Sequence, residues 1–351
     1  MVLFGVNMNA RQTKIIEIIK AKNVRSFSDI SKHIDSVSPR TLSRDLSELV
    51  ALGFLETEGK GRSLVYNLPV TGRFFAPIDS VVYNQQEPDK RAGVLAQYQF
   101  DVWQQWPRTL FSDNEHTHFK QLTATYQNKI SQRSNDVHAR ELERFVIEMS
   151  WKSSRIEGNT YTLLDTELLL RDGIVSNKNS KEETQMILNH KTAFNYVREQ
   201  SISDDTRLTR VYVEKVQSLL MQGLLTDVGL RKNPVGITGS NYRPLDNQFQ
   251  IQEAFESLVE TINNRENVFD KALTALLGIS YIQPFVDGNK RTARLVANGI
   301  LLQGSAAPLS YRNVDESNYR ASLLVFYEQM SVVAMRQIFV DQYAFATRHY
   351  S

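Results

Sequence analysis

The sequence contains no cysteine, which excludes a disulfide framework and every thiolate metal site. It also lacks any run of eighteen apolar residues, so no membrane-spanning helix is predicted and no membrane contact is expected. The first fourteen residues have only a short apolar stretch with no basic region before it, which argues against a signal peptide. These absences together predict a cytoplasmic protein.

A strong charge of one sign is missing as well. The 41 lysines and arginines nearly balance the 39 aspartates and glutamates, giving a formal net charge of +2. No global field therefore points to nucleic acid or an anionic surface, and any such contact must come from a local patch. At 351 residues the chain is long enough for two or three domains.

Residues 1–70 show the spacing of three helices followed by a β-hairpin. Apolar residues predict helices over about 9–21 and 27–34, and Ser38-Pro39 is typical of the start of a third helix that stops at Gly53. The hairpin is predicted on both sides of a turn at 59–62. This order predicts a winged helix, and residues 38–55 resemble the helix-turn-helix of bacterial regulators.

The third helix and the wing carry the candidate DNA contacts, because they lie off the apolar stripe. They are Arg40, Thr41, Ser43, Arg44, Lys60 and Arg62. With 10 basic and 7 acidic side chains this region is only mildly basic. A winged helix used for dimerisation or partner docking is therefore an equal alternative. A homodimer is expected, since it would place two such helices one DNA turn apart.

The remainder of the chain is predicted to be mainly α-helical. Residues 71–139 are interpreted as a linker, extended over 71–95, and a helical region, and residues 140–351 as one helical domain. Apolar side chains recur at helical spacing around 142–156, 187–197, 213–220, 251–262 and 269–277. Within the second of these stripes, His190 is interpreted as a packed core residue.

Residues 283–294 concentrate charged and turn-forming side chains in a short segment before an apolar run. A turn at Gly288 and Asn289 opens a helix whose N-terminal N–H groups and dipole suit an anion. Arg291 and Arg294, three residues apart, share one face of that helix. Asp287 is a carboxylate that can hold the magnesium accompanying a polyphosphate.

The same segment resembles the Fic/Doc signature His-Pro-Phe-x-Asp-Gly-Asn-Gly-Arg-x-x-Arg, with Gln283 in place of the leading histidine and Lys290 in place of the second glycine. The resemblance implies an all-helical Fic domain that moves AMP from ATP, with Mg2+, to a hydroxyl of a target protein or of itself. It places magnesium at Asp287 and polyphosphate at Arg291 and Arg294. It also implies that Gly288, Asn289 and Lys290 line an anion-binding nest and that Phe285 anchors the loop in the core.

Between the third and fourth helical stripes, glycines flank short β-branched pieces at 229–244, which predicts a hairpin. In Fic proteins a hairpin here, the flap, registers the target segment by strand addition. The flap residues implied are Val235, Gly236, Ile237, Thr238 and Gly239.

An inhibitory motif is the second feature shared with the family. Ser153, Glu157 and Gly158 match its pattern Ser/Thr-x-x-x-Glu-Gly/Asn. Gly158 can take the left-handed turn that ends a helix. From that end Glu157 could pair with Arg294 and keep it from the γ-phosphate.

Position 283 decides whether the chain can act as an enzyme. The family's histidine is the general base, whereas a glutamine amide has no basic nitrogen. The chain as written is therefore expected to bind nucleotide and be catalytically silent. Gln283 fits both a deliberate replacement and a natural pseudoenzyme. Two other functions remain open: a Doc-like protein kinase, favoured by Lys290, and a nucleotide-sensing DNA-binding regulator, favoured by Gln283 and the winged helix.

Overall fold

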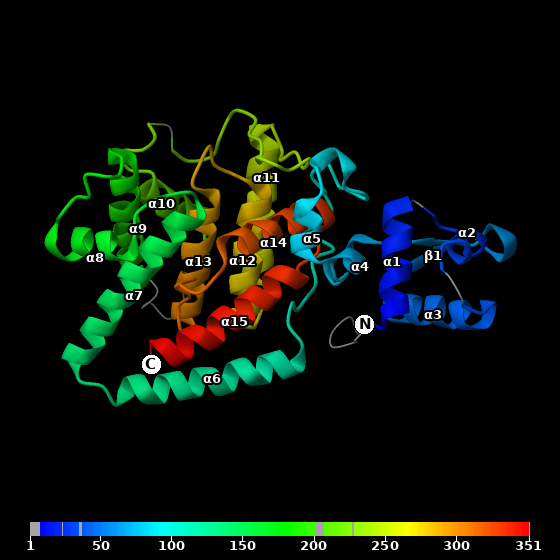
Figure 1. Cartoon of the computed structure of the whole chain (residues 1–351), viewed down its shortest axis with the longest axis horizontal. Helices are drawn as coiled ribbons and strands as arrows, with labels where there is room; N and C mark the ends of the chain where they lie inside the picture. Colours follow the sequence, from blue (N-terminus) through cyan, green and yellow to red (C-terminus); the bar gives the residue numbers. More distant parts are fainter. Residues whose placement is uncertain (1–7, 23, 35–36, 201–206, 227, 351) are drawn as a thin grey trace. The chain divides into compact units, whose positions relative to one another are not determined.

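The computed structural model describes residues 8–22, 24–34, 37–200, 207–226 and 228–350. It divides into two compact units, each described by itself. Unit 1 comprises residues 1–113, 236–243 and 321–336, and unit 2 comprises 114–235, 244–320 and 337–351. Helices dominate, which confirms the mainly α fold (Figure 1). None of the helices in the described part is both long and apolar enough to cross a membrane.

Unit 1 begins with three helices at the places where the apolar spacing predicted them, α1 (Ala10–Lys22), α2 (Phe27–Ser31) and α3 (Pro39–Ala51). Helix α3 starts where expected because the Ser38 hydroxyl accepts a hydrogen bond from the Thr41 N–H at 3.2 Å. It stops before Gly53, whose φ of 80° ends the helical path.

A two-stranded antiparallel sheet follows, in the position of the predicted N-terminal hairpin. Strand β1 (Glu56–Glu58) pairs with β2 (Val65–Asn67), with Thr57 opposite Tyr66, and a short 3-10 helix, η1 (Gly61–Ser63), lies between them. Val65 also bridges Ser26, and the Tyr66 N–H donates to the Arg25 carbonyl at 2.8 Å. The segment before α2 is therefore joined to the sheet.

The expectation of an extended linker over 71–95 was wrong. This stretch contains α4 (Val70–Phe74), α5 (Ser80–Gln85) and the 3-10 helix η2 (Pro88–Lys90). Tyr83 is buried against Leu324 and Val325, so the stretch packs into the core of unit 1. Helices of five or six residues make fewer than two turns, so they give no apolar period that a sequence could reveal.

Unit 2 is built from longer helices. Their bounds, together with those of three helices (α6, α14 and α15) that have residues in both units, are α6 (Asp113–Ser131), α7 (Asn135–Ile156), α8 (Leu163–Asp172), α9 (Lys181–Gln200), α10 (Arg210–Leu220), α11 (Gln248–Asn263), α12 (Val268–Ile282), α13 (Asn289–Gln303), α14 (Glu316–Gln329) and α15 (Val333–His349). Helices α12 and α13 run next to one another, and α7, α9 and α10 also contact α13 (Figure 1). The loop at 283–288 therefore joins two helices at the centre of the unit.

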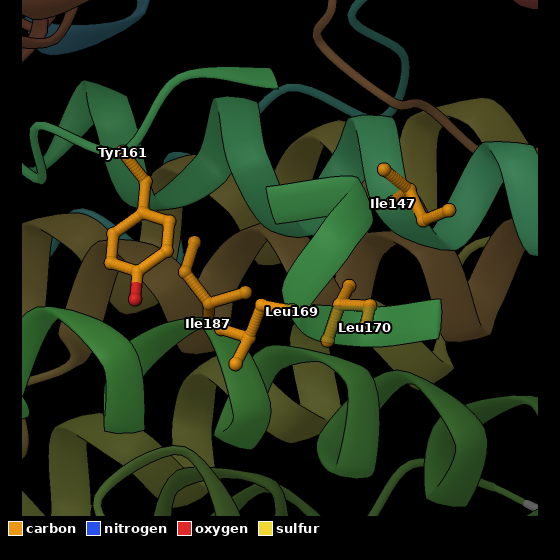
Figure 2. Close-up of a cluster of buried hydrophobic side chains, with 5 residues drawn as sticks. All are labelled: Ile147, Tyr161, Leu169, Leu170 and Ile187. Atoms are coloured by element: carbon orange, nitrogen blue, oxygen red, sulfur yellow. The ribbon is translucent and has the colours of Figure 1, made fainter. Parts of the chain in front are cut away.

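The C-terminal part of α7 is held by a small apolar cluster (Figure 2). Its members come from α7, the loop after it, α8 and α9, and they are Ile147, Tyr161, Leu169, Leu170 and Ile187. The Tyr161 hydroxyl also lies 2.7 Å from the Thr184 hydroxyl of α9. This packing fixes the chain on both sides of Glu157, the residue that ends α7.

The segment 229–244, all of it described, differs from the predicted hairpin because it forms no strand pair of its own. It contains a turn, in which Ser240 N–H donates to the Ile237 carbonyl at 3.0 Å, and bridges at Leu230 and Arg243 to other segments. Pro234 and Pro244 have no N–H to give to a ladder. The strand pairing of this part of the chain is therefore made with Phe285 and Gln97.

Candidate functional site

Two left-handed residues shape the loop between α12 and α13. Gln283 caps α12 with φ 50° and ψ 57°, and Gly288 precedes α13 with φ 82°. A Cβ at Gly288 would also lie only 2.9 Å from the Met221 sulfur. The positive φ thus favours glycine at this position, and a larger residue would also have to displace the Met221 side chain.

The side chain of Asn289 closes the loop from inside. Its Oδ1 accepts from the Phe285 N–H and its Nδ2 donates to the Phe285 carbonyl, both at 2.9 Å. The Phe285 ring is fully buried, with its centroid 6.0 Å from that of Phe255. Phe285 therefore lies in the core, where the sequence placed the loop anchor.

Asp287 is the most accessible charged side chain of the loop, with 61% of its side chain exposed. Its carboxylate accepts from the Gly288 N–H at 2.6 Å and from Arg291 Nη2 at 2.9 Å. The described residues contain no group of three metal-ligating side chains. The donor set fits Mg2+ held in the usual way for a nucleotide site, by one carboxylate, phosphate oxygens and water.

The two arginines of α13 are buried and only partly satisfied. Arg291 and Arg294 have side chains 4% and 1% exposed. Within the described chain, Nη1 of each has no hydrogen-bond partner. Unpaired buried guanidinium N–H groups are rare because they are costly, and an anion would satisfy them. The N–H groups of the first turn of α13 add further donors.

Glu157 lies against the cations of α13. It follows the last residue of α7, and Gly158 turns the chain away with φ 99°. Its Oε1 accepts from Arg294 Nη2 at 2.8 Å and its Oε2 is 3.6 Å from Lys290 Nζ. Burial alone would raise the pKa of Glu157, but the charges of Arg294, Lys290 and Arg291 lower that pKa to about 2. Glu157 is therefore a carboxylate at neutral pH.

Ser153, His190 and Tyr319 surround Arg294, whose guanidinium carbon lies 5.5 Å from the centre of the Tyr319 ring. Arg294 donates from Nε to the Ser153 hydroxyl and from Nη2 to the Ser153 carbonyl, both at 2.9 Å. His190 Nδ1 lies 3.0 Å from the Met186 carbonyl, so Nδ1 carries the proton and Nε2, 2.9 Å from Ser153 Oγ, accepts from that hydroxyl. Burial and the charge of Arg291 lower the pKa of His190 to about 3, which keeps it neutral.

Gln283, at the position where the resemblance to the Fic/Doc signature implies a base, has no basic atom. Its side chain is almost buried, and its Nε2 donates to the Ser280 carbonyl at 2.6 Å. Its backbone carbonyl accepts from the Nε of Arg231 at 2.6 Å. Arg231, which lies in the segment where a hairpin was predicted, thus contacts position 283 through a backbone carbonyl that no sequence motif marks.

The other predicted site residues lie elsewhere. Of the flap residues, Val235 belongs to unit 2 and Gly236, Ile237, Thr238 and Gly239 to unit 1, where the Gly239 carbonyl accepts from Arg91 at 2.7 Å. Their role as a flap stays a prediction.

The proposed DNA contacts of unit 1 are mostly exposed. Arg40, Ser43, Arg44 and Lys60 are exposed and Thr41 is partly exposed. The side chain of Arg62 lies outside the described residues. The role of these six residues in DNA binding stays a prediction.

Comparison with known proteins gives one family. The model of the Fic/DOC family matches residues 207–301. Protein adenylyltransferase fic-1 of Caenorhabditis elegans is 24% identical over 177 residues, which are 48% of this chain and 34% of that protein. The Caenorhabditis briggsae protein of the same name is 24% identical over 176 residues, again 34% of its length. The chain thus spans about a third of the length of these relatives.

Solved structures share the fold. A fragment of Fic-1 from C. elegans has a TM-score of 0.56 at 17% identity, covering 68% of this chain and 71% of that one. A Fic domain containing signaling protein from Bacteroides thetaiotaomicron has a TM-score of 0.54 at 22% identity, covering 66% and 94%. At these identities the likeness shows the fold.

Proposed function

Residues 207–301 form a domain of the Fic/DOC family, and from this we propose that the chain is a Fic-type protein adenylyltransferase with a silenced site. It binds ATP with Mg2+ at the loop between α12 and α13. The observation that carries this proposal is the pair of buried guanidinium groups, Arg291 and Arg294, whose Nη1 atoms have no partner in the described chain. A polyphosphate supplies the oxygen acceptors that they lack.

The same loop offers the other groups that a nucleotide needs. The first turn of α13 provides backbone N–H groups and the positive end of a helix dipole for phosphate. Lys290, partly exposed on that turn, adds a cation. Asp287 would hold Mg2+, which neutralises phosphate charge when bound. The magnesium assignment is supported by the exposure of the Asp287 carboxylate, which leaves it accessible to a metal ion.

The reaction requires a base that this chain lacks. AMP transfer joins a hydroxyl oxygen of the target protein to the α-phosphorus of ATP and releases pyrophosphate, and the hydroxyl proton must go to a nearby group. Residue 283 is the position of that group in the family. Because the Gln283 amide accepts no proton at neutral pH, the chain as written binds ATP without transferring AMP.

A second block comes from Glu157. Its carboxylate already occupies Arg294 and lies near Lys290, the two cations that would otherwise meet phosphate. A phosphate is negatively charged like the Glu157 carboxylate, so it would have to displace that carboxylate before it could bind these cations. We therefore propose that Glu157 is an inhibitory residue, held in place by Gly158 and by the Ser153 contacts to Arg294.

Nucleotide binding tests the assignment of the loop. In a Glu157→Gly background, Arg294→Ala is expected to weaken ATP binding at least about 10-fold and AMP binding little, because Arg294 serves the distal phosphates. Asp287→Ala is expected to remove the gain in ATP affinity that Mg2+ provides. Calorimetry with and without Mg2+ measures both.

The matched control is Arg171→Ala, since Arg171 of α8 makes surface ion pairs with Glu143 and Glu167. It should leave both affinities unchanged. Equal losses for ATP and AMP in Arg294→Ala would place this arginine away from the distal phosphates.

A second candidate function is DNA binding by residues 1–70, used by a regulator that senses nucleotide. Its specific support is α3, which begins at a capped N-terminus and carries the exposed Arg40 and Arg44. The two-stranded sheet follows α3 in the chain and is bridged to the segment before α2, which is the order expected of a winged helix. The exposed Glu56 and Glu58 of β1 oppose it, since they would repel phosphate. A homodimer would present two such helices.

DNA binding can be measured directly. Arg40→Ala with Arg44→Ala in the full chain is expected to weaken binding to fragmented genomic DNA and to lower the log–log salt slope by about one for each arginine that no longer meets a phosphate. Gel shifts over a salt series measure this, with Lys14→Ala, on the exposed side of α1, as the control. Binding that is absent at low salt, in a chain that still self-associates, would make residues 1–70 an assembly module.

A further inference from the structure

Arg231 is buried at the centre of unit 2, with 1% of its surface exposed. Each of its three side-chain nitrogens donates to a backbone carbonyl. Nε donates to Gln283 at 2.6 Å, Nη1 to Asn233 at 2.8 Å, and Nη2 to Leu245. One side chain therefore joins both ends of the segment 233–245 to the residue at the position of the family's base.

The backbone next to Arg231 holds the same loop. The Arg231 N–H donates to the Pro284 carbonyl at 3.0 Å, and Leu230 bridges Phe285. Two successive carbonyls of the α12–α13 loop, at 283 and 284, thus point at a single residue. An arginine is suited to this task because its planar fork keeps several donors in fixed directions, which a lysine cannot do.

Residue 283 needs such support because its backbone is strained. Gln283 has φ 50° and ψ 57°, a left-handed conformation that is unfavourable for a residue with a Cβ. A strained conformation persists only where the surroundings over-determine it. The bond from Arg231 Nε fixes the carbonyl of this residue, and so fixes the direction in which its side chain leaves the backbone.

We propose that Arg231 is a positioning residue for position 283. It holds whatever side chain stands there in the orientation needed for proton transfer, and it couples that orientation to the two ends of the segment 233–245. This inference rests on the proposed function only for its catalytic readout, since the positioning itself can be seen without any reaction.

The test uses Gln283→His with and without Arg231→Lys, observed by NMR of the imidazole ring. The ring introduced at 283 is expected to give one sharp set of signals with Arg231 present, and doubled or broadened signals with Arg231→Lys. His190, buried and hydrogen-bonded to Ser153, is the internal control and should not move. Unchanged signals from the introduced ring would overturn the proposal.

Activity gives the second readout. With Arg231→Lys, kcat of the chain carrying Gln283→His and Glu157→Gly is expected to fall about 10- to 100-fold because the base is misplaced, while the Kd for ATP stays within about twofold. Asn233→Ala is the matched control, because Arg231 uses only the backbone carbonyl of that residue. A parallel loss of kcat and ATP affinity would overturn the positioning role.

The failure of the two proposals can be told apart. An inactive chain carrying Gln283→His and Glu157→Gly would count against the proposed function, while the NMR signals would still decide the role of Arg231. If His190 signals show that Arg231→Lys does not fold, Arg231→Met, which fills a similar apolar volume without any N–H donor, replaces it under the same criteria.

Discussion

Gln283→His combined with Glu157→Gly is expected to transfer AMP to protein about 10²–10⁴ times faster than Glu157→Gly alone, the range over which a general base contributes. The reason is local to position 283. Under the proposed function the loop supplies the other groups that the transfer needs, and only the proton acceptor is missing.

The geometry at 283 suits a histidine. The Gln283 amide donates to the Ser280 carbonyl at 2.6 Å from a side chain that is 8% exposed. An imidazole here could keep one N–H on that carbonyl, which would fix its tautomer and leave its other nitrogen as the base. Neutral imidazole takes a proton near pH 7, whereas an amide does not.

Self-modification with α-labelled ATP and Mg2+ measures this effect. Gln283→Asn with Glu157→Gly is the matched control, because it changes the side chain without supplying a base, and it should stay at the Glu157→Gly rate. Equal labelling of the histidine and asparagine variants would show that residue 283 is not the base.

Glu157→Gly is expected to tighten ATP binding by about 10- to 100-fold, since a charge-assisted hydrogen bond contributes roughly 1.5–3 kcal/mol and must be given up before phosphate can bind. The carboxylate at 2.8 Å from Arg294 Nη2 and 3.6 Å from Lys290 Nζ is the group removed. The free chain should also become less stable, because buried Arg294 then loses its carboxylate and keeps only the Ser153 hydrogen bonds and the Tyr319 ring among its described contacts.

Calorimetry on the Gln283 background separates this binding effect from chemistry. Glu157→Gln is the informative control, as it removes the charge and keeps the shape, and an intermediate affinity is expected. ATP should restore the melting temperature that Glu157→Gly lowers, because a ligand that binds only the folded chain stabilises it. The same affinity with and without Glu157 would remove it as an inhibitor.

The elements that could be predicted were those whose signal is local. Helix α3 was predictable because Ser38, Pro39 and Gly53 mark its ends and its leucines give the period. Helices α4 and α5 were missed because each is shorter than two turns, and their formation depends on packing such as Tyr83 against Leu324 and Val325. The pairing of Leu230 with Phe285 was missed because it joins segments far apart in the sequence.

The same distinction applies to the site. The loop residues from Gln283 to Arg294 and the motif ending at Glu157 lie in short strings whose chemistry could be interpreted directly. Arg231 lies 52 residues from Gln283 and His190 lies 37 residues from Ser153. Arg231 acts on backbone carbonyls, which carry no side-chain signal in a sequence, so only the fold reveals it.

The most direct test of the central claim, an AMP-transfer site silenced at Gln283 and blocked by Glu157, is the fate of the ATP phosphates. The unmodified chain and the Gln283→His, Glu157→Gly chain are each incubated with Mg2+ and ATP labelled at the α- or the γ-phosphate. We expect α-label on protein only with the double variant, and γ-label on neither. γ-label on protein would indicate a kinase, and no label from either phosphate on the double variant would contradict the claim.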